Sequence, residues 1–210
     1  IELQPSYTQG GLFSTSESIW NKIATWKLNF AATEEESSKV TYIMSFLEKF
    51  FADFVWQEGG QTWKNTAKNE ERKVIIFSQF YLHLLAIEQA LERRGIPVAQ
   101  VYGNRMSSKV QEIQKFKTNA NVPILLMDIN GAVGLDLFFV SHLFLMDPIV
   151  DKSLEEQIIA RAWRMGAKDL VHVYRLVMKD SVEHHMLLKT DRRTTTSVET
   201  LLSLKRVNIP

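Results

Sequence analysis

The sequence contains no cysteine among its 210 residues. A disulfide framework, a zinc ribbon and a thiol nucleophile are therefore excluded. Long apolar runs are missing too, and none approaches the roughly 18 residues that a membrane-spanning helix needs. We therefore expect no membrane association. Hydrophobic residues make up 45% of the chain and charged residues 23%, which are ordinary values for a globular domain and exclude a disordered chain.

Several signatures of self-sufficient enzymes are also missing. The sequence has no G-x-x-x-x-G-K-[ST] phosphate loop, no G-x-G-x-x-G loop, no G-x-S-x-G elbow and no H-E-x-x-H zinc helix. The histidines form no ligand set, because His184 and His185 point in different directions from a helix and His83 lies among apolar residues. We expect no metal site, and we do not expect the chain to hydrolyse a nucleotide by itself.

Positive and negative charges nearly balance over the whole chain, which has a formal net charge of +1 and a pI near 8.1. Any surface that grips nucleic acid must therefore be local. Residues 92–117 carry six basic and two acidic side chains, a net charge of +4. This stretch predicts either a basic patch or a solvated charged face that contacts nothing.

The chain begins with Ile1 rather than methionine, which suggests a piece of a longer protein. We divide it into a poorly defined lead-in (residues 1–33), a leading helix with a polar linker (34–72), an α/β domain (73–190) and a C-terminal tail or brace (191–210). The leading helix is predicted by apolar residues at three- and four-residue spacing behind an acidic run. They are Val40, Ile43, Leu47, Phe50 and Phe54.

Five short apolar runs alternate with amphipathic stretches in the α/β domain. They are VIIF (74–77), PVAQVY (97–102), VPILLM (122–127), HLFLM (142–146) and VHVYRLV (171–177). The intervening stretches predict helices that end at Gly95, follow Ser107 with Val110, Ile113 and Phe116 on one side, and begin near Ser153 and Ser181. Such alternation predicts a mostly parallel sheet with helices on both faces, a three-layer α/β fold.

The segment EEQIIARAWRMGAKDLVHVY (155–174) holds the most informative side chains. On a helix ending at Gly166, Gln157, Arg161 and Arg164 fall at positions i, i+4 and i+7, so one face presents an amide and two guanidinium groups. Two such arginines can clamp a phosphate, because each offers a rigid fork of donors and keeps its charge. The alternative is a solvated helix face paired with the neighbouring glutamates.

This segment looks like motif VI of superfamily 2 helicase-like ATPases, in particular the Swi/Snf-related chromatin-remodelling group. Three further segments resemble motifs of that family in the same order. KVIIFSQF (73–80) is similar to motif IV, VYGNRMSSKVQEIQKF (101–116) to the segment after it, and LLMDINGAVGLDL (125–137) to motif V. The residues that match the family lie in the segment after motif IV, in motif V, and in motif VI with the strand that follows it. They are Tyr102, Gly103, Gly131, Gly134, Leu135, Leu137, Gln157, Arg161, Ala162, Arg164, Gly166 and residues 171–176.

The resemblance implies a RecA-like fold and a role as the second, C-terminal lobe of a nuclear, ATP-dependent translocase on double-stranded DNA or nucleosomes. In this family two RecA-like lobes close on ATP. The first lobe supplies the phosphate loop and the acidic box that binds Mg²⁺, and the second supplies arginines from motif VI. The N-terminal lobe of the same parent protein is therefore an implied partner, and the chain alone is expected to be inactive.

The family's functional positions transfer to this sequence residue by residue. The resemblance implies that Arg164 is an arginine finger, which is worth roughly 10³ to 10⁵ in rate where it has been measured, that Arg161 is a second phosphate contact and that Gln157 orients the reacting groups. The implied nucleotide-binding residues are Gly131, Gly134, Asp136, Arg161 and Arg164, and the implied DNA-binding residues are Ser78, Gln79, Tyr102, Gly103, Asn130 and Gly131. The glycines let backbone N–H groups approach phosphates, and a simple turn is the alternative for them.

The sequence departs from the family pattern at three positions. Trp163 stands where the family has histidine, Ala167 where it has glutamine, and Asp136 where it has asparagine. These departures favour an alternative function, a degenerate, non-catalytic lobe that binds DNA or protein as a scaffold. The short segments GAVGLDL, FLMDP and RMGA resemble the sequences of the subgroup that carries RING or F-box elements. An unrelated α/β ligand-binding domain is the third reading, since fold alone does not fix function.

Overall fold

The computed structural model describes residues 36–51, 54–57, 62–65, 72–103, 108–132, 134, 137, 139–163 and 171–191. The predicted lead-in (1–33) lies outside these residues. So does the predicted tail (191–210) beyond its first residue, at which the last described helix ends.

The five apolar runs form the five strands of one parallel sheet. β3 (Val74–Phe77) lies at its centre, with β5 (Ile124–Met127) and β4 (Val98–Val101) on one side and β6 (His142–Leu145) and β7 (His172–Arg175) on the other. A parallel ladder needs a crossover connection between successive strands, and helices supply it. The predicted three-layer α/β fold is confirmed.

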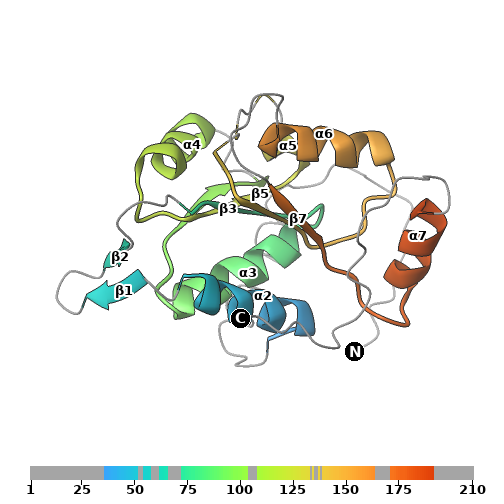
Figure 1. The fold of residues 1–210 in the computed structure, drawn as a ribbon, viewed down its shortest axis with the longest axis horizontal. Coiled ribbons are helices and arrows are strands. Elements are labelled where there is room, and N and C mark those ends of the chain that lie inside the picture. The colour runs from blue at the N-terminus through green and yellow to red at the C-terminus, as the bar shows by residue number, and fades with distance from the viewer. Residues whose placement is uncertain are drawn as a thin grey trace, which may run out of the picture. The chain divides into compact units, whose positions relative to one another are not determined.

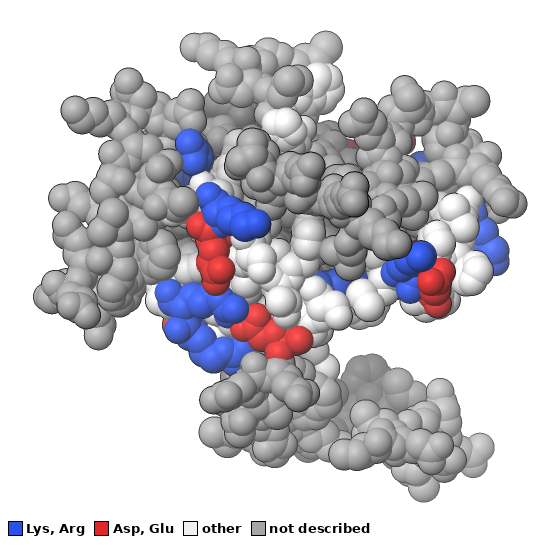
Figure 2. Space-filling view, turned by 60° about the horizontal axis from the view of Figure 1, so that its bottom comes forward, with Lys and Arg blue, Asp and Glu red and all other residues white. Residues whose placement is uncertain are grey.

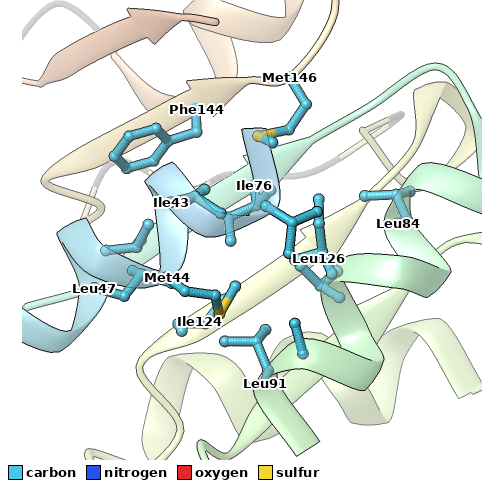
Figure 3. Packing of buried hydrophobic residues seen from close by; sticks show 14 of the residues in the cluster. Ile43, Met44, Leu47, Ile76, Leu84, Leu91, Ile124, Leu126, Phe144 and Met146 are labelled. Atoms are coloured by element: carbon cyan, nitrogen blue, oxygen red, sulfur yellow. The ribbon is translucent and has the colours of Figure 1, made fainter. Parts of the chain in front are cut away.

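Side chains of the central strands alternate between two separate cores. Val74 and Ile76 pack into one cluster while Ile75 and Phe77 pack into the other, and all four are completely buried. Because successive side chains of a strand point to opposite faces, an unbroken apolar run fits a strand with a core on each side. Figure 3 shows the first cluster, in which Ile76 meets residues from two helices and from the neighbouring strands.

Helices cover both faces of the sheet (Figure 1). On one face lie α2 (Ser38–Phe50) and α3 (Tyr81–Arg93), and on the other lie α4 (Lys109–Thr118), α5 (Ile129–Ala132) and α6 (Lys152–Ala162). The connection from β3 runs toward β4 and places α3 on the first face. The later connections run in the opposite direction along the sheet, so a single handedness puts their helices on the second face. α7 (Val182–Asp191) follows β7.

Three local details differ from the sequence prediction. The leading helix begins at Ser38 behind an N-cap Ser37, so the acidic run precedes the helix instead of forming its first turn. Phe54 belongs to a strand, because β1 (Phe54–Gln57) pairs antiparallel with β2 (Thr62–Asn65) inside and beside the predicted linker. Val110 of α4 is 80% exposed, so only the part of α4 near Phe116 is buried in the core.

Candidate functional site

The topology brings the predicted DNA-binding residues to one edge of the sheet. β4, β5 and β3 are neighbours and run parallel, so the segments that follow them leave the sheet side by side. These segments carry Tyr102 and Gly103 after β4, Asn130 and Gly131 after β5, and Ser78 and Gln79 after β3. Open α/β sheets bind ligands at the carboxyl ends of their strands, which makes this carboxyl edge the candidate site.

A buried carboxylate at the end of β6 organises the loop after β3. Asp147 Oδ2 accepts hydrogen bonds from Ser78 Oγ (2.5 Å) and from the backbone N–H of Gln79 (3.0 Å), and Oδ1 lies 3.0 Å from His83 Nδ1. Gln79 Nε2 also donates to the Pro148 carbonyl at 3.2 Å. Burial opposes ionisation of Asp147, yet the hydrogen bonds from His83 and Ser78 outweigh burial and hold its pKa below the ordinary value. The loop is therefore fixed by a charged, fully bonded group.

A second carboxylate, at the end of β5, joins the loop after β4 to the short helix α5. Asp128 Oδ2 accepts from the backbone N–H of Gly103 at 3.0 Å, and Oδ1 accepts from the N–H of Gly131 at 2.7 Å. Lys109 Nζ donates to the Asn130 carbonyl at 3.2 Å. Partial burial lowers the pKa of Lys109, and the nearby Asp128 carboxylate opposes that shift.

Close packing explains why glycine stands in two of these loops. A Cβ on Gly131 would lie 2.0 Å from the Val101 carbonyl oxygen, and one on Gly103 would lie 2.4 Å from a ring carbon of Tyr81. Gly103 also has φ of +62°, a conformation that side chains disfavour. Gly134 has φ of +74° as well, but no heavy atom lies within 4 Å of its Cβ position, so the backbone there is open.

Two predicted DNA-contact side chains are turned into the protein. Ser78 is completely buried against Asp147, and Tyr102 is 1% exposed with its hydroxyl group bonded to the buried Glu88 of α3. Neither side chain can reach a DNA backbone in this conformation. The family resemblance implied these two residues for the DNA-binding segments, but a motif does not indicate which way a side chain points.

The motif VI helix is shorter than the sequence predicted. α6 begins behind Asp151, whose carboxylate accepts from Ser153 N at 2.9 Å, and it ends at Ala162 with Trp163 in an extended conformation. The expected helix up to Gly166 is wrong, because Trp163 has β-region dihedral angles. Gln157 and Arg161 keep their i, i+4 relation within α6, and position i+7 falls beyond the helix. Arg164 lies outside the described residues, as do Asp136 and Ala167.

The described part of motif VI still meets motif V. Arg161 is half-buried, and its carbonyl accepts a hydrogen bond from the backbone N–H of Leu137 at 3.0 Å. Gln157 is exposed on α6, and its amide lies 3.4 Å from Ser153 Oγ. Glu155, one of the glutamates considered as arginine partners, is buried and pairs with Arg175 of β7 instead.

The basic stretch of residues 92–117 does not form one patch. A helix that follows a parallel strand runs back across the sheet, so Arg93 and Arg94 at the end of α3 lie far from Lys109 at the start of α4 along the strand direction. Both arginines pair with Glu36, at 3.1 Å and 2.5 Å. Figure 2 shows this face, where basic and acidic side chains lie in contact. For these two arginines the solvated charged face is the correct interpretation.

Sequence reasoning missed the two organising carboxylates and His83's contact with one of them. A signal was present, because Asp128 directly follows the buried strand β5 and Asp147 follows the last residue of the apolar run 142–146. An acidic residue there lies at the carboxyl edge. Within the described ranges no cluster of three or more histidine or acidic side chains could hold a metal ion, and no helix is both long and apolar enough to cross a membrane.

Comparison with known proteins identifies the family of the chain. Residues 60–166, half of the chain, match the helicase conserved C-terminal domain. An F-box protein of Arabidopsis thaliana is 36% identical over 89% of the chain, the DNA repair protein rad8 of Schizosaccharomyces pombe 35% over 64%, and the human helicase-like transcription factor 38% over 57%. The chain spans 14% of the first relative and 12% of each of the other two.

A solved structure has the same fold. The C-terminal part of the Fun30 ATPase domain superimposes with a TM-score of 0.64 at 20% identity, covering 88% of this chain and 55% of that one. The fold is therefore the RecA-like α/β fold that the motifs implied. The chain belongs to the helicase conserved C-terminal domain family, which confirms the recognition of a Swi/Snf-related, helicase-like C-terminal lobe from its four ordered motifs.

Proposed function

We propose that the chain is the second lobe of an ATP-dependent translocase on double-stranded DNA, of the kind that remodels chromatin in the nucleus. The observation that carries this proposal is the hydrogen bond from Leu137 N to the Arg161 carbonyl. It joins the glycine-bearing loop of motif V to the helix of motif VI, so a loop at the predicted DNA edge and a predicted nucleotide contact belong to one connected unit. The first RecA-like lobe of the parent protein completes the site.

DNA contact is proposed for the groups that the carboxyl edge leaves accessible. Asn130 is exposed, and Gln79 and Gly103 are half-buried. Contacts of this kind grip phosphates without reading sequence, which suits an enzyme that moves along DNA or on nucleosomes. Ser78 and Tyr102 support the same loops from within, through Asp147 and Glu88.

ATP and Mg²⁺ are the cofactors that the proposal requires. When bound, ATP supplies the phosphoryl group whose transfer drives translocation. Open space around Gly134 and the half-buried residue Arg161 fit an approaching phosphate. Within this chain Arg161 and Arg164 would bind and stabilise phosphate charge, Gln157 would orient the reacting groups, and the first lobe would hold Mg²⁺.

The proposal is tested by the DNA-stimulated ATP hydrolysis of the full-length parent protein. We expect Arg164→Ala to lower turnover by about a hundredfold or more, the order expected for a lost arginine finger. Arg93→Ala is the matched control, because Arg93 is exposed and pairs with Glu36 on the face of α2 and α3. We expect the control to leave turnover unchanged, since surface ion pairs contribute little.

The second candidate function is a non-catalytic scaffold lobe that binds DNA or protein. Trp163 favours it, because a tryptophan that is 51% exposed replaces the family's histidine where α6 ends. A scaffold requires the intact parent to bind duplex DNA without DNA-dependent turnover, or to keep its turnover when Arg164 is removed. Either result would contradict the translocase and assign the chain to this second function.

A further inference from the structure

Two backbone N–H groups, one from the loop after β4 and one from the short helix α5, converge on one side chain at the carboxyl edge. Gly103 N–H, after β4, and Gly131 N–H, after β5, donate to opposite oxygens of the Asp128 carboxylate at 3.0 Å and 2.7 Å. The backbone of Asp128 adds to the connection, since its N–H donates to the Val101 carbonyl at 3.4 Å. Asp128 therefore links the ends of two adjacent parallel strands through both its side chain and its main chain.

The two glycines themselves offer no side chain with which to fix these loops. A Cβ would collide with the Val101 carbonyl at Gly131 and with the Tyr81 ring at Gly103. Each loop must therefore be held through backbone atoms, and a carboxylate is a suitable holder because it accepts at both oxygens and bonds N–H groups more strongly than a neutral acceptor does. Lys109 fixes the outer side of the second loop through the Asn130 carbonyl.

The charge of Asp128 is opposite to what direct DNA contact would favour. A carboxylate near the path of a phosphate backbone repels it, and the repulsion is felt over roughly 10 Å at moderate salt. A direct contact at this position would favour a neutral or basic side chain. The hydrogen bonds give the carboxylate a different role, because they fix the loop that carries Gly103 and the short helix α5 that carries Asn130 and Gly131.

We propose that Asp128 is a positioning residue, which holds the loop after β4 and the short helix α5 in register so that the exposed Asn130 and the accessible part of the Gly103 loop can contact a DNA duplex. The proposal rests on the proposed function, from which it takes the ligand. It makes a prediction of unusual sign: removing a negative charge from a DNA-binding edge weakens DNA binding. Electrostatics alone predicts tighter binding for the same change.

The test compares Asp128→Asn with Asp151→Asn in the 210-residue chain. Asparagine keeps the size of the side chain, but its amide can accept only one of the two N–H groups and presents donors to the other. Asp151 also follows a strand of this sheet, is exposed and caps α6, where asparagine caps as well as aspartate. The two variants therefore lose the same charge, and only the first loses the link between the loops.

Binding is measured by fluorescence anisotropy of a labelled, blunt-ended DNA duplex at about 50 mM and about 200 mM salt. We expect Asp128→Asn to bind roughly tenfold more weakly at the lower salt concentration, which corresponds to the loss of about 1.4 kcal/mol. Asp151→Asn is expected to bind as tightly as the unchanged chain or slightly more tightly. If both variants bind alike while the unchanged chain binds, the positioning role is overturned and the proposed function stands. If the unchanged chain does not bind the duplex at either salt concentration, DNA contact by this edge and the positioning role fail together.

Amide hydrogen exchange tests the same role without DNA. We expect Asp128→Asn to speed exchange at Gly103 and Gly131 by roughly tenfold, while the amides of the central strands β3 and β5 keep their protection. Faster exchange throughout the sheet would instead indicate lost global stability. In that case we test Asp128→Ser, whose hydroxyl group can still accept one N–H. This variant must restore the protection of the sheet amides, while the amide of at least one of the two glycines still exchanges fast. Unchanged exchange at both glycines in the variants would overturn the proposal.

Discussion

Gly131, in α5, and Gly134, after that helix, lie three residues apart but need glycine for different reasons. At Gly131 a Cβ would meet the Val101 carbonyl oxygen at 2.0 Å, and that atom belongs to the backbone of β4 and cannot swing away. At Gly134 the space is empty and only the positive φ of +74° disfavours a side chain. The first position is limited by packing and the second by backbone conformation.

We expect Gly131→Ala to lower the free energy of unfolding by about 2 to 3 kcal/mol, since overpacking at a rigid contact forces backbone shifts. Gly134→Ala is the matched control three residues further on and is expected to cost only about 1 kcal/mol, the strain of a left-handed conformation. Urea unfolding followed by circular dichroism gives both values. Equal losses for the two variants would show that the contact with Val101 relaxes more easily than the structure implies.

Lys39 joins three elements that are distant in sequence. Its ammonium group, on a side chain of α2 in a residue only 8% exposed, donates to the Met146 carbonyl after β6 at 2.6 Å and to Glu183 of α7 at 2.8 Å. Glu183 in turn accepts from the N–H of Met178, in the segment before α7. The hydrogen bonds of this lysine thus connect α7 to the main layers of the domain.

We expect Lys39→Met to destabilise the domain by about 2 kcal/mol, because methionine leaves a buried carbonyl and a carboxylate without their donor. The control is Lys49→Met on the same helix, where the lysine is exposed. Differential scanning fluorimetry and amide exchange across α7 would measure the two effects. The prediction fails if α7 exchanges equally in both variants, since the link through Glu183 would then hold nothing in place.

Strands were easier to predict from this sequence than helix ends. A run such as VIIF (74–77) has no polar position, so it must belong to a strand or a helix that is buried on all sides. Because the run is too short for a helix and is flanked by breaks, it predicted the strand β3. The end of α6 was mispredicted because nothing in residues 155–166 stops a helix before Gly166. Val110 was mispredicted as well, because the start of α4 projects beyond the core and local spacing cannot reveal that.

The candidate site was predictable in outline but not in its internal bonding. The resemblance implied DNA-binding residues in three separate segments, and the order β4-β5-β3 brings these segments together at the carboxyl edge. The sequence could not show which side chains point inward. Asp147 forms hydrogen bonds with residues 64 to 69 positions earlier in the chain, and Asp128 accepts one from Gly103, which follows another strand. Such partners become neighbours only when the sheet has formed. The inward direction of the Tyr102 and Ser78 side chains was unpredictable for the same reason.

The molecule separates its candidate site from a titratable cluster at the opposite edge of the sheet. His142 and His172 are the first residues of β6 and β7, directly opposite each other in register, with ring centroids 5.0 Å apart. Phe50 of α2 packs edge-on against His142 at 4.3 Å. Burial, together with the charges of His172 and Arg72, lowers the pKa of His142 from 6.5 to about 4. The titratable cluster therefore lies at the amino edge of the sheet, and the candidate site lies at the carboxyl edge.

This depressed pKa predicts how the stability of the whole domain changes with pH. Between pH 6.5 and about 4 the unfolded chain protonates this histidine while the folded chain keeps it neutral. The stability that neutral His142 contributes is therefore fully present above pH 6.5 and is lost as the pH falls through that window. Asp147 has a pKa below its ordinary value of 3.8, so its own contribution is lost mainly at lower pH.

We expect His142→Phe, which keeps an aromatic ring beside Phe50 and Tyr174 but cannot titrate, to flatten the loss of stability between pH 7 and pH 5. Urea midpoints of the variant and the unchanged chain at both pH values measure the effect, and taking the difference cancels all other titrating groups. His185→Phe is the control, because His185 is exposed on α7. If the urea midpoints of the His142 variant and the unchanged chain fall equally with pH, then His142 is protonated in the folded chain without loss of stability, and the prediction is wrong. DNA affinity at pH 7 should be the same in both, because the amino edge takes no part in the contact proposed for the loops around Asp128.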